Sequence, residues 1–294
     1  MKPTRRDFLT LASWAASLPL FSPFIGKARA GSITPTEIDV QDAIAFFTAQ
    51  GYRETPTLDL ITGDAFNGGV RYDETAPGGL QDGKTLILQN CIRMEDINLH
   101  DRPDVLPYFH ILAINLKGPF PSATALGTAL DYLVNHIELD PARLAFVSTD
   151  FFTPYLPHLK PFGIEASQFV IRDRKAALAA GDGSGFFSPK GHPHVNPYHS
   201  VSIHYAQAPD AMKQKLSPSL PGFIELGEIM IHEEAPEIED VQIAAFGLER
   251  ISMAMGSPVE SFAQSRDLAL TALEEEAKRH NIPLPPAYEK LKSA

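Results

Sequence analysis

The sequence predicts an α+β domain in which helices flank an antiparallel sheet. Two long apolar runs, Thr85–Ile92 and Leu106–Leu116, stand on either side of a charged loop and are typical of an antiparallel strand pair. A further apolar run, Val241–Phe246, continues directly into a helical segment from Gly247. Strands that pair locally, together with a strand that passes straight into a helix, indicate an α+β arrangement.

The remaining elements follow from periodicity and from turn residues. A first helix is expected from about Glu37 to Gln50, where Gly51 ends it, because Ile44 and Phe47 lie near one face. Apolar spacing predicts another helix over Ser122–Ile137. We expect further strands at Leu144–Val147, Phe169–Ile171, Ser200–Tyr205 and Gly222–His232, and a short helix at Lys175–Ala180.

A long amphipathic helix is expected near the end of the chain. Ser257–Glu260 reads S-P-V-E, which is a capping box with proline at the first helical position. The helix is therefore predicted over about residues 257–280.

The first thirty residues are expected to form a cleavable export signal. The Arg5-Arg6 pair resembles a twin-arginine signal, residues 11–25 are apolar, and Ala28 and Ala30 suit a small-residue cleavage site. The alternative is an uncleaved membrane anchor. The cleaved form predicts one domain, residues 31–294, delivered to the periplasm or secreted by the twin-arginine export machinery.

Charge and cysteine content restrict the partners of this domain. Residues 1–30 hold five Lys or Arg and one Asp, so the mature chain keeps 20 basic and 35 acidic residues, a net charge of −15. Nucleic acid is a poor partner for such a chain, because a phosphate backbone is bound by a basic face. Cys91 has no second cysteine with which to pair, so the fold depends on its core.

Five short motifs occur in a fixed order along the chain. Together with the opening helix they resemble the catalytic domain of alanyl-tRNA synthetase, a class II synthetase, over about residues 35–265. The resemblance implies the class II fold and a homodimer, although the first class II motif is not located. The motifs are Leu86–Ile97 (L-I-L-Q-N-C-I-R-M-E-D-I), Phe109–Leu112 (F-H-I-L), Asp140–Leu144 (D-P-A-R-L), Gly222–Leu226 (G-F-I-E-L) and Phe246–Ile251 (F-G-L-E-R-I).

The resemblance implies ATP-dependent activation of a carboxylic acid as an acyl-adenylate. Arg93 matches the family's arginine between the carboxylate and the α-phosphate, and Asp96 lies in the same motif. Arg250 matches the arginine at the triphosphate tail, Phe109 the aromatic residue that stacks on adenine, and Glu249 an oxygen ligand or structural partner near Mg²⁺. A guanidinium group suits the meeting of two anions, because its planar fork stays charged.

Departures from the family pattern concern the substrate end of the site. Ile243 stands where the family has an aspartate that receives the substrate ammonium. The family's E-I-W-N becomes Glu225–Glu228, with Gly227 for the tryptophan and Glu228 for the asparagine. Loss of the tryptophan is expected to enlarge the pocket, and Glu228 is the candidate replacement for the ammonium partner. These changes predict either another substrate than alanine or a site without activity.

Structural roles compete with the functional ones. Arg93 could pair with Asp96 or Glu95 at a strand end, Arg250 could pair with Glu249 at a helix start, and Phe109 could be a core residue. The family's tRNA-recognition, editing and zinc-binding parts are absent, which with the acidic charge argues against transfer to tRNA.

A second candidate site is a histidine cluster. Residues 191–204 hold four of the ten histidines, and His192-x-His194 could place two imidazoles on one side of an extended segment. That spacing suits Zn²⁺ or another divalent metal, with His199 or His232 completing the set. The alternative is a polar loop with scattered histidines.

The sequence thus supports three functional hypotheses. The first is a class II synthetase-like ligase that activates a small amino or related carboxylic acid with ATP and Mg²⁺. The second is an exported binding protein whose adenylation site is degenerate. The third is a metal-dependent periplasmic enzyme that uses His192, His194 and His199.

Overall fold

A computed structural model describes residues 40–70, 81–99, 102, 105–121, 123–180, 182–187, 198–231 and 241–294. They belong to one compact unit, Pro35–Ala294. The expected export signal, residues 1–30, lies outside the described residues. Within the described part of the chain, no helix has the length and apolar character needed to cross a membrane.

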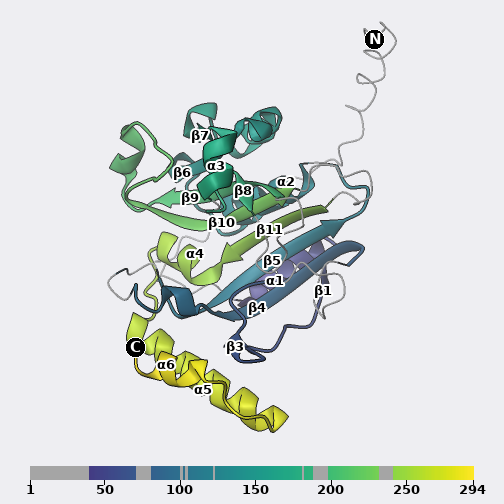
Figure 1. The fold of residues 1–294 in the computed structure, drawn as a ribbon. Helices are drawn as coiled ribbons and strands as arrows, with labels where there is room; N and C mark the ends of the chain where they lie inside the picture. Colours follow the sequence, from purple (N-terminus) through teal and green to yellow (C-terminus); the bar gives the residue numbers. More distant parts are fainter. Residues whose placement is uncertain are drawn as a thin grey trace, which may run out of the picture. The chain divides into compact units, whose positions relative to one another are not determined.

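A nine-stranded, mostly antiparallel sheet flanked by helices confirms the predicted fold class (Figure 1). Its strands follow the order β1-β4-β5-β11-β10-β9-β6-β7, with β8 paired to β9, while β2 and β3 form a separate hairpin. Only the outer pairs β1–β4 and β6–β7 are parallel. The strands are β1 Arg53–Glu54, β2 Ile61–Thr62, β3 Ala65–Phe66, β4 Gly83–Ile92, β5 Tyr108–Lys117, β6 Leu144–Thr149, β7 Phe169–Arg172, β8 Phe186–Phe187, β9 Tyr198–Ala206, β10 Phe223–Ile231 and β11 Val241–Gly247.

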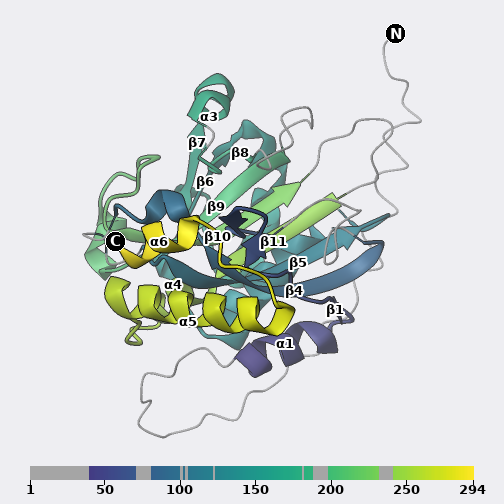
Figure 2. The same ribbon diagram turned by 60° about the horizontal axis from the view of Figure 1, so that its bottom comes forward.

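Six α-helices are present among the described residues. Figure 2 shows α1 beneath β1 and β4, and both ribbon views place α5 and α6 side by side. Short 3₁₀ segments connect other elements, the longest being Asp150–His158, and a π-helical turn at Asp131–His136 extends α2. The helices are α1 Val40–Ala49, α2 Thr124–Leu130, α3 Arg174–Ala180, α4 Leu248–Ala254, α5 Phe262–His280 and α6 Ala287–Lys292.

The main core lies between one face of the sheet and the helices α1 and α2. Alternate strand residues project to this face, because side chains alternate along a strand. Leu86, Leu112, Ala244 and Ile203, from four strands, belong to one buried cluster with Phe47 of α1. We call this the core face, and the side that faces away from it the open face.

The predicted strand pair is confirmed as β4 and β5, which pair in antiparallel register from Gly83↔Lys117 to Ile92↔Tyr108. Strand β11 lies between β5 and β10, at the centre of the sheet. Its Gln242 ties α2 to the sheet, because its side-chain oxygen accepts from the Ala125 amide at 3.0 Å and its Nε2 donates to Pro121 O at 2.8 Å.

The last long helix begins later than predicted. It starts at Phe262, and Ser261 is its N-cap, with a capping box to Gln264; the predicted start at Ser257 is wrong. Ser261-Phe-Ala-Gln264 is itself an S-x-x-Q sequence, so it competes with the S-P-V-E signal four residues earlier. The Ser257 amide instead donates to Ser252 O, at the end of α4. The predicted end at His280 agrees with the structure.

Candidate active site

The open face carries a row of small side chains at the centre of the sheet. In register across five strands, this row runs Ser202, Glu228, Ala245, Ala113 and Ile87. Ala245 lies in the central strand and is nevertheless partly exposed. A small residue at the centre of a sheet reaches solvent only where the layer over it is incomplete, and we call this part of the open face, around Ala245, the hollow.

A β-bulge in β10 places two carboxylates on the open face. The register with β9 shifts between Glu225 and Gly227, so one extra residue enters the strand there. Leu226 and Ile229 both belong to the core cluster. Glu225 and Glu228, which strict alternation would put on opposite faces, therefore share the open face.

Gly227 does not enlarge the pocket, and the expectation that it would is wrong. A β-carbon at Gly227 would stand 2.0 Å from the carbonyl oxygen of Ala245. The neighbouring backbone fills the space in which a side chain would begin. Glycine at this position permits the bulge and the close approach of the two strands.

Glu228 is a partly buried carboxylate to which no described residue donates a hydrogen bond. Its pKa is raised to about 8, mainly by burial and also by the nearby Glu225, while Arg93 acts to lower it. The Cα of Gly183 packs against this carboxylate, since a β-carbon there would lie 1.8 Å from Glu228 Oε1. At neutral pH such an acid is mostly protonated, so an ammonium group that binds there must displace its proton.

Arg93 lies at the end of β4, beside the hollow. Its guanidinium carbon is 4.8 Å from the centre of the Phe109 ring, and its Nε donates to Gly68 O at 2.9 Å. These contacts fix the plane of the group, and no described residue bonds to its two terminal nitrogens. Arg93 does not pair with Asp96, which is half-buried in the 3₁₀ turn Met94–Asp96.

Arg250 approaches the same hollow from the start of α4. Its Nη1 is 3.2 Å from Glu225 Oε2, so its ion pair crosses to β10 and does not involve Glu249. Arg93 and Arg250 both lower the pKa of Glu228. The two arginines, 157 positions apart in the sequence, therefore act on one carboxylate.

Glu249 serves as a structural partner in this structure. Its carboxylate accepts from the His110 amide at 3.0 and 3.1 Å and lies 2.6 Å from His110 Nδ1. In this structure Glu249 is thus bound to His110, and Glu225 is bound to Arg250.

A histidine–serine network lies next to Glu225 and was not predicted. His204 pairs in register with Glu225, and its Nε2 is 2.9 Å from Ser202 Oγ, which is 2.8 Å from Ser184 Oγ. Burial lowers the pKa of His204, so the ring is neutral near pH 7. The network depends on the pairing of β9 with β10 and with the loop before β8, which no local motif reveals.

The other predicted site residues lie elsewhere. Ile243, predicted at the substrate end of the site, is fully buried in one cluster with Tyr198 and Met230. His192 and His194 lie outside the described residues. His199 is buried on the core face, where its ring stacks on Phe151 with centroids 3.8 Å apart. The described residues contain no group of three or more metal-binding side chains.

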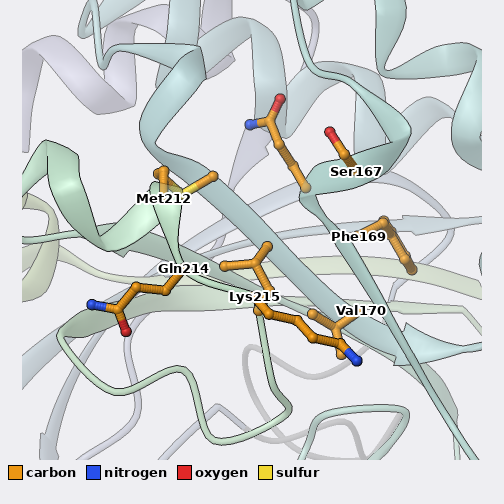
Figure 3. A pocket seen from close by; sticks show the side chains of 8 residues that line it. Ser167, Phe169, Val170, Met212, Gln214 and Lys215 are labelled. Atoms are coloured by element: carbon orange, nitrogen blue, oxygen red, sulfur yellow. The ribbon is translucent and has the colours of Figure 1, made fainter.

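A pocket of about 480 Å³ lies at another part of the fold, at the β7 edge of the sheet. Figure 3 shows Met212 and Gln214 on one side of it and Ser167 and Phe169 on the other. None of the predicted site residues lines it.

The fold and the site thus define an α+β domain with a hollow lined by arginines and carboxylates on the open face of its sheet. Comparison with solved structures matches apo histidyl-tRNA synthetase of S. aureus with a TM-score of 0.41 and 13% identity, covering 82% of this chain and 75% of that chain. No protein-family model and no curated protein matches the sequence. Neither the alanyl resemblance nor a substrate follows from these comparisons.

Proposed function

We propose that this protein is a class II synthetase-like ligase, which activates an amino or related carboxylic acid with ATP without charging tRNA. The observation that carries the proposal is that Arg93 and Arg250 approach one hollow from opposite ends of the chain. Their order and spacing match the two arginines of the motifs described above. The acidic charge of −11 on the whole chain disfavours tRNA as the acyl acceptor, so we assign that part to a small molecule or a carrier.

The proposed chemistry joins two anions. A carboxylate oxygen of the substrate attacks the α-phosphorus of ATP, the bond from that phosphorus to the bridging oxygen breaks, and pyrophosphate leaves with the electron pair. Arg93 would bridge the carboxylate and the α-phosphate through its two terminal nitrogens. Stacking on Phe109 and the bond to Gly68 O hold the guanidinium before substrate arrives, which reduces the reorganisation needed in the transition state.

The remaining residues would position the two substrates. Arg250 would exchange its contact with Glu225 for the triphosphate tail. The Glu228 carboxylate would receive the ammonium of an amino acid, in place of the family aspartate that Ile243 replaces. The small side chain of Ala245, which is partly exposed, would leave room for the backbone of such a ligand.

Pyrophosphate exchange into ATP across a panel of amino and carboxylic acids tests the proposal on the purified full chain. We expect exchange with at least one acid and a loss of about 10²–10³-fold in Arg93→Lys, because lysine keeps the charge without the fork. Arg53→Lys is the control, since Arg53 is exposed at the sheet edge and bonds to Gln81. No exchange with any acid, together with no ATP binding in calorimetry, rules the proposal out.

A binding protein without adenylation activity is the second candidate. The ion pair between Arg250 and Glu225 favours it, because the arginine assigned to the triphosphate already has a carboxylate partner. A thermal-shift screen separates the two functions. Stabilisation by amino acids or metabolites but never by nucleotide would support the binding protein.

A further inference from the structure

Thr85 on β4 and Asn115 on β5 stand directly opposite each other in the strand register. Thr85 is 0% exposed and Asn115 is 1% exposed. Within the part of the chain that the structure describes, the Thr85 hydroxyl and the side-chain oxygen of Asn115 have no hydrogen-bond partner. Unpaired buried polar groups are rare because each one destabilises the fold, so two on facing positions require a cause.

Both side chains belong to the open face. Leu86, Leu112 and Ile114 point into the main core, so their neighbours Thr85 and Asn115 project to the other side. Along the row, Asn115 is also opposite Ile243 of β11. The pair therefore lies one row from Ala113 and Ala245, next to the hollow.

Gln89 is a buried polar residue of the open face whose side chain does form hydrogen bonds within the protein. Gln89, four residues along β4 from Thr85, is also 0% exposed. It donates to Leu58 O and Asn90 O and accepts from the Leu58 amide. Among the described residues, the Thr149 hydroxyl on β6 is likewise buried on this face without a partner, and Thr85 and Asn115 differ from it in standing opposite each other in register.

We propose that Thr85 and Asn115 form a polar subsite that receives the hydroxyl or carboxamide group of an amino-acid side chain. The inference rests on the proposed function in so far as Glu228 holds the ammonium of the same ligand. A hydroxyl can donate to Asn115 and accept from Thr85, and a carboxamide can do the same. The substrate class is then a small amino acid with a polar, uncharged side chain.

Sheet geometry agrees with one ligand reaching both groups. Glu228 and Asn115 are two strands and one row apart, which places their Cα atoms about 12 Å from each other. Their side chains shorten that gap from both ends. Two hydrogen bonds of about 2.9 Å and the three or four bonds of about 1.5 Å between an amino acid's nitrogen and its side-chain oxygen fill the rest.

The test compares isosteric ligands and isosteric variants in the full chain. Calorimetry measures the affinity for threonine against valine and for asparagine against leucine. We expect the wild-type protein to prefer the polar member of a pair by at least about 10²-fold, because a site built to bond a polar group rejects its apolar isostere. In Thr85→Val and Asn115→Leu the preference should fall below about tenfold.

Thermal unfolding without ligand gives a readout that does not depend on activity. Thr85→Val and Asn115→Leu should each raise Tm by about 2–4 °C, because an unpaired buried polar group is removed. Thr55→Val is the matched control: Thr55 is 3% exposed and its hydroxyl donates to Leu86 O at 3.2 Å. It should lower Tm by a similar amount.

The outcomes separate this inference from the proposed ligase activity. If Thr85→Val and Asn115→Leu lower Tm as Thr55→Val does, the two groups are satisfied internally and the subsite is refuted. An equal affinity for threonine and valine, and for asparagine and leucine, also refutes it, even if exchange with ATP is found. A polar preference that the two variants abolish supports the subsite, even in a protein that exchanges no pyrophosphate.

Discussion

Gly183 leaves the space that the Glu228 carboxylate occupies. The glycine has φ +80°, and a β-carbon on it would stand 1.8 Å from Glu228 Oε1. Ser200 Oγ donates to Gly183 O and Arg172 holds the following Ser184 carbonyl at 2.9 Å, so the loop cannot move aside freely. Glycine is therefore required here both for backbone conformation and for the position of the acid.

Gly183→Ala should consequently disturb the site more than the fold. The positive φ alone destabilises an alanine variant by about 1–2 kcal/mol. Gly51→Ala is the control, because Gly51 has φ +85° and no atom within 4 Å of its β-carbon position. We expect both variants to lose that stability in urea unfolding, and only Gly183→Ala to bind amino acids at least about tenfold more weakly in calorimetry. Equal binding by both variants would contradict the role of the contact.

Glu228 should give the protein a defined pH dependence. Burial raises the pKa of this carboxyl from 4.5 to about 8, so between these values the folded state binds more protons than the unfolded state. The free energy of unfolding therefore falls as the pH rises from about 4.5 to about 8, and the loss is complete above pH 8. Glu228→Gln should be more stable than the wild type at pH 8.5 by up to about 5 kcal/mol, and nearly equal to it near pH 4.5.

Urea unfolding at the two pH values measures this difference, with the exposed Glu275→Gln as control. A gap between Glu228→Gln and wild type that does not change with pH would disprove the assignment. An ammonium ligand should also release a proton from Glu228 when it binds below pH 8, which calorimetry in buffers of different ionisation enthalpy detects.

Glu276, which lies in α5, should be essential for packing that helix against the segment that contains Leu60 and Ile61. This carboxylate is 4% exposed and accepts from the amides of Leu60 at 2.9 Å and Ile61 at 2.7 Å. Glu276→Ala leaves two amides without partners, so we expect a loss of about 2–4 kcal/mol in urea unfolding. Glu275→Ala, the exposed neighbour, should change stability by less than about 0.5 kcal/mol. Similar losses in both variants would show that helix propensity, not the buried bonds, is responsible.

Cys91 should be chemically inert in the folded protein. The thiol is buried, and burial raises its pKa to about 12. Because the thiolate is the reactive form, iodoacetamide at pH 8 should label Cys91 only when the chain unfolds. Mass spectrometry with and without urea checks this. Labelling of the native protein as fast as a free cysteine peptide would show that the residue is accessible.

Local pattern was sufficient for the long elements and for two of the site residues. Continuous apolar runs located β4, β5 and β11, because a strand buried on both faces is apolar throughout. Arg93 and Arg250 were found because each lies in a short motif at the end of such a strand. Both affect the Glu228 carboxylate because the order of the strands brings them near it, while their roles toward a nucleotide stay predictions.

What escaped prediction depends on contacts between distant residues. The bulge at Gly227 is set by the close approach of Ala245, so the sequence alone suggested a larger pocket where the structure has backbone. His204 lies opposite Glu225, and is linked to Ser184 through Ser202, only because distant strands pair. The 3₁₀ segment Asp150–His158 contains Pro154 and Pro157, which interrupt any regular period.

The central place of β11 has a consequence for biosynthesis. Residues 53–117 supply β1, β4 and β5, and residues 144–231 supply β6 to β10, but only residues 241–247 join the two halves. Until the ribosome has released that segment, β5 and β10 each present an unpaired edge that invites aggregation. Most of the chain must therefore be made before the two half-sheets can join. Because the strands that β11 brings together are far apart in the sequence, we expect folding to be slow.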